Sequence, residues 1–172
     1  NLIGSLLWKP NDQLEVTWGI DYLEDKLQNY WGTPIVTEGF ATQPLIGVVE
    51  GTVTGGAAAI DERTQFVNYN VSDAVADSYQ ILTTLGLNWK HSNNLSFRNY
   101  TYLLNADREW RNSEQYTFNS TTSLIDRDRF FVAHEQITVG NRMSVKYKNT
   151  LAGMENQYLV GIDSSYVDFE RK

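Results

Sequence analysis

The chain has 172 residues, enough for one domain, and a formal net charge of −7 from 14 Lys and Arg against 21 Asp and Glu. A nucleic-acid-binding domain needs a basic surface, so we expect no nucleic acid among its partners. Hydrophobic residues make up 41% of the chain and cysteine is absent, which excludes a disordered chain and a disulfide or thiolate-metal scaffold. We expect neither a transmembrane helix nor a signal peptide, since the sequence has no long apolar run and no basic N-terminal stretch.

Aromatic residues make up 13% of the chain, beside 12 Gly and only 3 Pro, a composition typical of β-rich proteins. Residues 14–22 alternate between apolar side chains, such as Val16 and Trp18, and small or polar ones, such as Thr17 and Gly19. This period of two indicates a strand with one apolar face. The same alternation elsewhere, with two weaker segments at 2–8 and 95–110, predicts six strands, which cover residues 2–8, 14–22, 79–90, 95–110, 137–148 and 157–166.

Two details of these elements stay open in the sequence. Residues 95–110 change phase near Asn99, which indicates either a β-bulge there or a continuous strand in which Tyr100 and Tyr102 point to the polar, inward side. Residues 2–8 are apolar without a clear phase. Helix is nearly absent from the prediction, and only residues 71–78 are expected to form a turn or two.

The connections fall into two classes. Turn-forming residues at 9–12, 91–94 and 152–156 predict short hairpin loops, whereas residues 28–75 and 111–134 are long connections. Short and long connections alternate along the chain, so all short turns are expected at one end of the sheet and both long loops at the other. The fold predicted from this order is an all-β, antiparallel up-and-down meander.

This loop asymmetry is typical of transmembrane β-barrels, which also carry aromatic girdles at both interfaces. The ten residue steps from Tyr79 to Trp89 would span about 33 Å along a strand. Tilted by about 45°, they would cross roughly 23 Å, close to the ~25 Å apolar band of such barrels. Aromatic residues fall near both expected ends: Trp8, Trp89, Phe97 and Tyr147 near the short turns, and Tyr22, Tyr79 and Tyr166 near the long loops.

A membrane-spanning sheet cannot leave an unpaired edge in hydrocarbon. Because bacterial barrels have eight strands or more, six predicted strands are expected to be a segment of a larger barrel. The competing interpretation is a two-sided soluble sheet whose polar face meets water. The polar face is expected to carry Glu15, Asp21, Lys90, Arg142, Lys146, Lys148 and Asp163.

The chain resembles the barrel of TonB-dependent siderophore receptors over nearly its whole length, and several short, scattered stretches carry this resemblance. They are Asp61-Glu62-Arg63-Thr64, Asn68-Tyr69-Asn70, Leu85-Gly86-Leu87-Asn88-Trp89, Leu95-Ser96-Phe97-Arg98-Asn99-Tyr100-Thr101, Trp110-Arg111-Asn112-Ser113-Glu114, Arg127-Asp128-Arg129, His134-Glu135-Gln136, Gly140-Asn141-Arg142 and Leu159-Val160-Gly161-Ile162-Asp163-Ser164-Ser165.

The resemblance implies that residues 1–172 are part of a 22-stranded barrel, with the plug domain and the remaining strands outside this chain. It implies a location in the outer membrane of a Gram-negative bacterium, in contact with its lipid, and a role in the import of ferric siderophores. The implied partners are the transported ferric siderophore and the energy-transducing TonB complex, reached through the plug.

The sequence has no phosphate-binding Gly-rich loop, HExxH motif or nucleophile elbow, so we expect no enzyme and no cofactor. Residues 51–56 are Gly-rich but lack the Lys of a P-loop, which favours a flexible loop. His91 and His134 have no second ligand at a suitable spacing and are expected to form hydrogen bonds rather than bind metal. Residues 126–129 alternate in charge, which favours a cross-strand charge ladder over a ligand clamp.

A bulky iron chelate would be gripped by cationic side chains and by the faces and hydroxyls of aromatic ones. The carboxylate pairs at 24–25 and 61–62 are expected to be solvated loop charges. Each ligand-binding candidate named below has an alternative role, either as an aromatic residue of the girdle or as a residue that packs within a loop. A soluble β-sandwich that binds carbohydrate and a porin without a plug remain the alternative functions. The candidates lie where strands meet long loops, and they are Tyr30, Trp31, Arg63, Tyr69, Arg108, Trp110 and Tyr116.

Overall fold

The computed structural model describes residues 1–45, 47–53 and 56–172, and these form two compact units. Unit 1 consists of Asn1–Asp25, Ser78–Arg108 and Ala133–Lys172, and unit 2 consists of Lys26–Asp77 and Glu109–Val132. None of the helical segments in the described ranges has both the length and the apolar character needed to cross a membrane.

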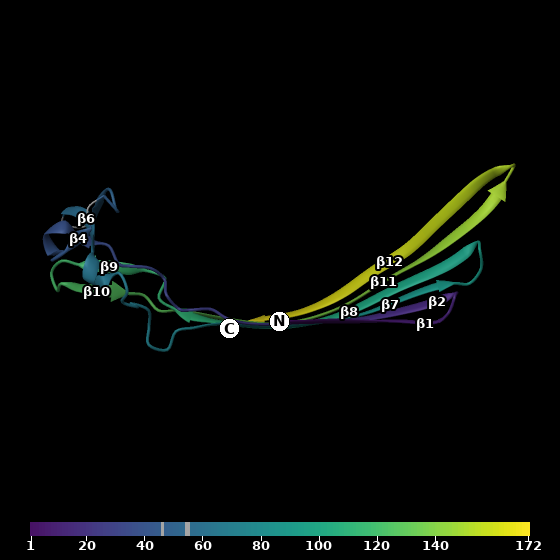
Figure 1. Ribbon diagram of the computed structural model, residues 1–172, viewed down its shortest axis with the longest axis horizontal. Helices are drawn as coiled ribbons and strands as arrows, with labels where there is room; N and C mark the ends of the chain where they lie inside the picture. Colours follow the sequence, from purple (N-terminus) through teal and green to yellow (C-terminus); the bar gives the residue numbers. More distant parts are fainter. Residues whose placement is uncertain (46, 54–55) are drawn as a thin grey trace. The chain divides into compact units, whose positions relative to one another are not determined.

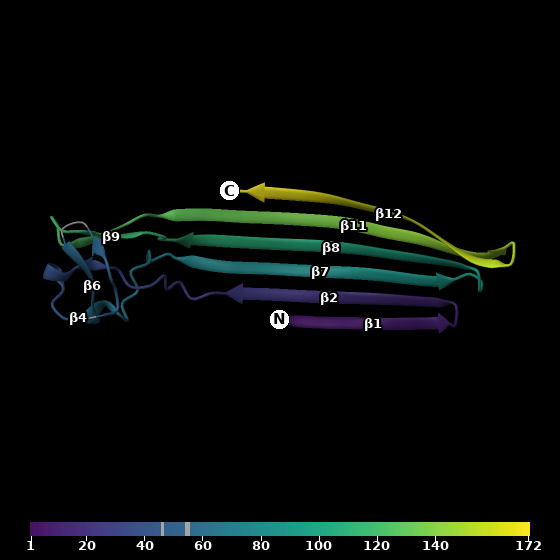
Figure 2. The same ribbon diagram turned by 90° about the horizontal axis from the view of Figure 1, so that it is seen from above.

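Six long strands build one antiparallel sheet in the order β1-β2-β7-β8-β11-β12 (Figure 2). Sequential strands are neighbours throughout, so the predicted up-and-down meander is confirmed. The strands are longer than the alternation alone indicated, and their bounds are β1 Leu2–Asn11, β2 Leu14–Lys26, β7 Val75–Lys90, β8 Leu95–Asn112, β11 Phe130–Leu151 and β12 Met154–Arg171.

The three hairpin turns of this sheet lie at the same end (Figure 2), as predicted. Asn11 Oδ1 accepts hydrogen bonds from the N–H groups of Gln13 and Leu14, both at 2.9 Å, and so closes the β1–β2 turn. Ala152 and Gly153 both have positive φ, at 53° and 79°, which is the backbone that a two-residue hairpin turn requires. Local side-chain and backbone chemistry therefore sets the position of these turns.

The strand register assigns each side chain to a face, because directly paired residues in an antiparallel ladder lie on the same side. Leu6 pairs with Trp18 and Val145 pairs with Val160 on the apolar face. On the opposite, polar face Arg142 pairs with Asp163, and their side chains form an ion pair at 2.6 Å. The two pairs of β11 and β12 therefore confirm the predicted division into an apolar and a polar face at that edge of the sheet.

The phase of β8 is resolved by two contacts. Asn141 Nδ2 donates to Thr101 Oγ1 at 2.7 Å, and Asn99 Nδ2 donates to Asn141 Oδ1 at 3.1 Å, which puts these odd-numbered residues on the apolar side. The Tyr102 ring lies against Gly140 on the polar side. Of the two predicted alternatives, the one in which Tyr100 and Tyr102 point to the polar face is therefore correct.

Both long connections contain short elements that the sequence did not predict. Strand β6 (Gly56–Asp61) pairs with β3 (Val36–Thr37), β4 (Pro44–Leu45) and β5 (Thr52–Val53). In the second connection β9 (Tyr116–Asn119) pairs with β10 (Leu124–Arg127). Two single 3-10 turns, η1 (Glu38–Phe40) and η2 (Glu62–Thr64), accompany β6.

The structure corrects one local expectation and leaves part of a second outside the described residues. The turn of helix expected over residues 71–78 is wrong, because Ser72 and Asp73 form only a turn and β7 already begins at Val75. Asn70 Oδ1 accepts the N–H of Val71 at 2.8 Å and the N–H of Ser113 at 2.7 Å, which draws this segment to β8. In the Gly-rich stretch, residues 54–55 lie outside the described residues, while Thr52 and Gly56 belong to strands.

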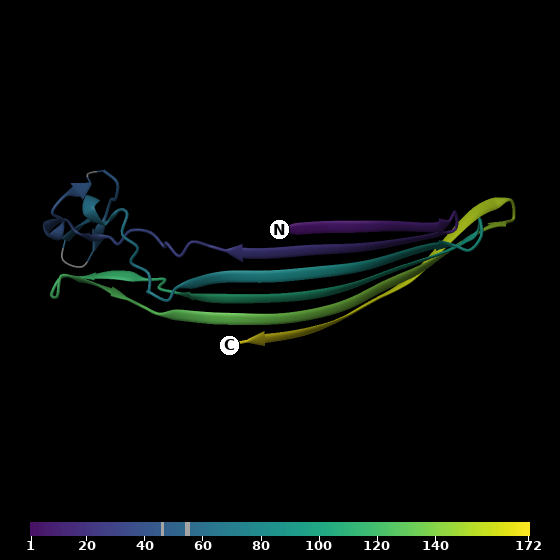
Figure 3. The ribbon, with the colours of Figure 1, turned by 60° about the horizontal axis from the view of Figure 1, so that its bottom comes forward.

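The two units differ in how they bury apolar side chains. Among the described residues, the buried apolar side chains are Val36, Ala59, Ala76 and Val132, all of which belong to unit 2. Unit 1 is a single curved layer (Figures 1 and 3). Its apolar face stays open, with Leu85 48% exposed and Ile162 57% exposed. The described part of the unit 1 sheet therefore has no hydrophobic core of its own.

Candidate functional site

Five of the seven predicted ligand-binding residues are aromatic, and the structure brings four of them together in pairs within unit 2. The Trp31 and Trp110 rings lie 5.2 Å apart between centroids, at 52°. The Tyr69 and Tyr116 rings lie 6.3 Å apart in an edge-to-face arrangement. We call these four residues, with Tyr30, the aromatic cluster. Its members come from both long connections and from the end of β8.

The cluster presents both exposed and buried groups. Tyr30 and Trp31 are 45% and 46% exposed, and the Tyr30 hydroxyl donates to the Gln65 carbonyl at 3.0 Å. The Tyr116 hydroxyl is buried and has no hydrogen-bond partner among the described residues. Burial raises the pKa of Tyr116, so the phenol stays neutral and can still donate a hydrogen bond. The cluster can therefore offer the stacking faces of Tyr30 and Trp31 at its surface, while the Tyr116 hydroxyl lies beneath that surface.

A groove of about 680 Å³ runs beside Tyr116 in unit 2. Its walls combine threonine hydroxyls with apolar surface, and the Phe118 ring in it packs edge-on against Phe40 at 5.1 Å. A concave surface with apolar walls and a few polar groups is the usual form of a small-molecule site. The lining residues are Thr33, Pro34, Ile35, Thr52, Val53, Tyr116, Thr117 and Phe118.

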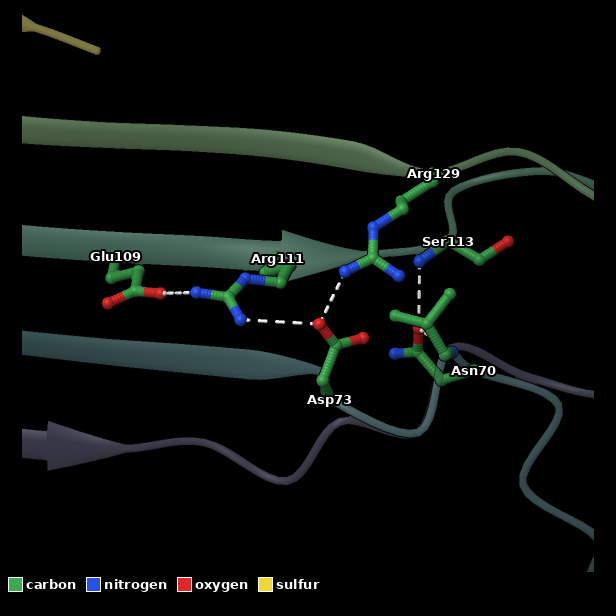
Figure 4. Close-up of polar contacts among 7 residues, drawn as sticks. Asn70, Asp73, Glu109, Arg111, Ser113 and Arg129 are labelled. Atoms are coloured by element: carbon green, nitrogen blue, oxygen red, sulfur yellow. Dashed lines mark hydrogen bonds and ion pairs between the residues drawn. The ribbon is translucent and has the colours of Figure 1, made fainter.

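A network of charges fixes the strand ends next to the cluster (Figure 4). Asp73 Oδ2 accepts from Arg111 at 3.2 Å and also pairs with Arg129, while Arg111 pairs in addition with Glu109. The two guanidinium groups, Arg129 first, lower the pKa of Asp73 below its usual value, so this carboxylate stays ionised. Asp73 thereby ties the residue before β11 to the end of β8.

Backbone groups of the two connections are joined by Asn70 and two charged side chains. Ser113 donates its N–H to Asn70 Oδ1 (Figure 4), and Arg127 donates to the carbonyls of Tyr69 and Asn70 at 2.7 and 2.9 Å. Asp128 Oδ1 accepts from Ser113 Oγ at 3.0 Å and from the N–H of Glu114 at 2.7 Å. These contacts hold Tyr69 and Tyr116 in their relative positions.

The same contacts overturn the charge ladder predicted for residues 126–129. Within β10, Asp126 pairs with Thr117 and Arg127 pairs with Tyr116, so no opposite charge faces either residue across the hairpin. The four side chains instead bind separate partners in the two connections. Each of the four alternating charges therefore attaches residues 126–129 to a different partner.

Arg63, another predicted ligand-binding residue, already uses its charge in an ion pair. It forms an ion pair with Asp61 at 2.7 Å, and Asp61 also accepts the N–H of Thr42 at 2.7 Å. The guanidinium holds the pKa of Asp61 far below its usual value. Asp61 is only 3% exposed, so its predicted role as a solvated loop charge is wrong. The pair closes the turn after β6 and leaves Arg63 partly exposed.

Arg108 is the one predicted ligand-binding residue that belongs to unit 1. It is the last residue of its segment in unit 1, within β8, and its side chain is exposed. The histidines each pack on one aromatic ring, with centroid distances of 5.0 Å for His91 and Trp89 and 5.2 Å for His134 and Phe169. No group of three or more metal-binding side chains is found within the described ranges.

The residues that sequence reasoning missed are the polar ones that position the cluster, above all Asn70, Asp73 and Asp128. Their partners lie 43 positions away in the case of Asn70 and Ser113, and 38 in the case of Asp73 and Arg111. The alternating charges at 126–129 were a signal, but the pattern does not identify the partners. In the comparisons with known proteins, no family model and no curated protein matches this chain.

Proposed function

We propose that this chain forms part of the β-barrel of an outer-membrane TonB-dependent receptor that imports ferric siderophores. The observation that carries the membrane assignment is the uncovered apolar face of the unit 1 sheet. Soluble monomers rarely expose contiguous apolar patches larger than a few hundred Å², and this face runs across all six strands. Lipid hydrocarbon would cover this apolar face without a second layer of protein.

The distribution of aromatic residues supports this assignment. Tyr147 and Tyr158 stack at 6.4 Å near the hairpin turns, and Tyr22 meets Tyr79 edge-on at 5.8 Å towards the other end. Tyr79 and Trp89 are separated by about 33 Å along β7. At a strand tilt of about 45°, this length crosses a thickness of roughly 23 Å, close to the ~25 Å apolar band. Aromatic rings at both borders are typical of membrane-spanning strands.

The open edges of the sheet motivate the larger barrel. Strands β1 and β12 are the two edges and pair on one side only. In hydrocarbon each unpaired backbone group costs several kcal/mol, so both edges need neighbouring strands. A 22-stranded barrel, which the resemblance implies, supplies these neighbours, with the polar face carrying Arg142 and Asp163 turned to the lumen.

The aromatic cluster supports the ligand part of the proposal. A ferric siderophore is bulky and often aromatic, so it can stack on the exposed rings of Tyr30 and Trp31. The soluble carbohydrate-binding sandwich would use similar aromatics, but it requires a second sheet over the apolar face. The described strands of unit 1 form one sheet only.

The membrane assignment is tested by placing a single fluorophore on either face, which the cysteine-free sequence permits. Val145→Cys on the apolar face and Ser144→Cys on the polar face form a matched pair of neighbouring labels. In lipid vesicles we expect a blue-shifted emission and quenching by a lipid-soluble quencher at position 145, with neither at 144. A protein that stays monodisperse and folded in plain buffer, without detergent, would contradict the proposal.

The ligand assignment is tested by the quenching of tryptophan fluorescence on titration with ferric catecholate, hydroxamate and carboxylate siderophores. We expect binding of one class to be weakened by Trp31→Leu or Tyr30→Leu. Trp8→Leu in β1 removes a tryptophan outside the cluster and serves as the control. Equal affinity in all three variants would remove the aromatic cluster from the site while leaving the membrane assignment in place.

A further inference from the structure

The polar face of unit 1 contains a basin at its hairpin end, with a volume of about 910 Å³. Five of the chain's 14 Lys and Arg residues line it, against only two of its 21 Asp and Glu residues, Asp12 and Glu15. The basin is thus locally positive in a chain of net charge −7. Its cations are Lys9, Lys90, Arg98, Lys146 and Lys148.

Ion pairing within the basin engages only one of these cations among the described residues. Lys9 forms an ion pair with Glu15 at 2.7 Å. Within the part of the chain that the structure describes, no carboxylate forms an ion pair with Lys90, Arg98, Lys146 or Lys148. Like charges crowded on a concave surface repel one another and attract an anion of matching shape. Lys90 also interacts electrostatically with Glu15, but the charges of these four cations remain available to an anionic ligand.

The spacing of the cations decides which anion fits. Lys90 lies on β7, Arg98 on β8, and Lys146 and Lys148 on β11, so the four cations outside the Lys9–Glu15 ion pair cross two strand intervals. At about 4.8 Å per interval this is about 10 Å, which is wider than a single phosphate. An extended peptide of about three residues has this length at ~3.3 Å per residue.

We propose that this basic basin binds an extended polypeptide segment that carries several carboxylates and lies across the strands. The segment pairs with the cations of β7, β8 and β11, while Glu15 keeps Lys9 engaged at one border. Because these pairs form at a partly exposed surface, several weak contacts together supply the affinity. The proposal is independent of the ferric siderophore and of what covers the apolar face.

The test is a binding titration of the full chain in a non-ionic detergent, with fluorescein-labelled hexaglutamate as the probe. We expect saturable binding that weakens as salt is raised. The double variant Lys146→Gln/Lys148→Gln is expected to weaken hexaglutamate binding about threefold to thirtyfold, since each exposed pair contributes modestly. The charge-preserving Lys146→Arg/Lys148→Arg variant is expected to retain binding.

The matched control removes two positive charges outside the basin, with Arg171→Gln/Lys172→Gln, and is expected to bind as the unmodified chain does. Circular dichroism of each variant establishes that the sheet is retained. If Lys146→Gln/Lys148→Gln and Arg171→Gln/Lys172→Gln lose the same affinity for hexaglutamate, the effect comes from net charge alone and the proposal is overturned. Inorganic phosphate that competes fully at equal concentration would assign a compact-anion site instead. A chain dimer that only Lys146→Gln/Lys148→Gln dissociates would assign the basin to a second copy.

Discussion

The ring of Tyr102 in β8 lies against Gly140 in β11, at the place where a Cβ on residue 140 would overlap the ring and its hydroxyl. Gly140 is buried, although it belongs to a single-layer sheet. An aromatic ring that covers a cross-strand glycine in this way fixes the alignment of two neighbouring strands. The contact therefore sets the register between β8 and β11 on the polar face.

Gly140→Ala is expected to destabilise the sheet by about 1–3 kcal/mol, because the Tyr102 ring has to leave its position. In the Tyr102→Ala background the same substitution is expected to cost much less, so a double-mutant cycle isolates the contact. Gly86→Ala in β7 is the control, since its Cβ would meet Thr17 at an ordinary 3.7 Å. Equal unfolding free energies for Gly140→Ala and Gly86→Ala would contradict this account.

Arginine substitutions on the apolar face distinguish lipid from water as its surroundings. Leu85 and Val145 are 48% and 42% exposed, so in water Leu85→Arg or Val145→Arg is expected to change stability by only about 0.5 kcal/mol. In a bilayer each is expected to cost about 2–4 kcal/mol near the midplane. Lys146→Ser on the polar face is the control and is expected to leave folding nearly unchanged. Folding yields in vesicles measure the difference, and a large defect in Lys146→Ser alone would mean that the faces are reversed.

A polar trio lies within the apolar face. Asn99, Thr101 and Asn141 form a closed set of hydrogen bonds between β8 and β11 at 2.7 to 3.2 Å. Asn141→Ala leaves the other two side chains without their partner and is expected to cost about 1–2 kcal/mol in lipid. The triple variant Asn99→Leu/Thr101→Val/Asn141→Leu is expected to restore most of that loss, because no polar group of the trio is then left unpaired. Urea titrations in vesicles give both values, and a triple variant weaker than Asn141→Ala would refute this reasoning.

The ion pair of Asp61 and Arg63 predicts a pH-dependent stability of unit 2. The pKa of Asp61 is lowered in the folded state, so its contribution is fully present above the ordinary carboxyl pKa of about 3.9 and is lost as the pH falls below it. The difference in unfolding free energy between the unmodified chain and Asp61→Asn is therefore expected to be constant near neutral pH and to shrink in acid. Tryptophan fluorescence during urea unfolding reports this difference.

Glu62→Gln removes a neighbouring carboxylate that is exposed, and it is the matched control. It is expected to leave the unfolding free energy of unit 2 nearly unchanged at each pH. A difference for Asp61→Asn that grows as the pH falls would have the opposite sign and would exclude the ion pair as its source.

The long sheet could be predicted because its determinants are local. The alternation of residues such as Val16 and Thr17 identifies both a strand and its faces, and Asn11 and Gly153 identify turns by their own backbone or side-chain chemistry. The extension of β11 back to Phe130 was missed, because the alternation is weak there and pairing with β12 from His134 onward helps to hold that end.

The site could be predicted only as a set of residue types. Tyrosine and tryptophan near the strand ends suggested stacking, but the pairing of Trp31 with Trp110 joins positions far apart in the chain. The burial of Asp61 depends on Thr42 and on the short strands around β6, which have no clear period in the sequence. Contacts of this kind arise from tertiary structure, which local patterns do not encode.

The polar contacts between the two long connections have a practical consequence for display. Asn70, Ser113 and Arg127 interlock residues of both connections, so an inserted epitope in either of these stretches would disturb the other. The tip of the β9–β10 hairpin is different, because the N–H groups of Thr121 and Thr122 bond to Asn119 within the same turn. A surface tag or an antibody-recognition sequence is therefore best grafted at that tip, where it leaves the framework of unit 2 unaltered.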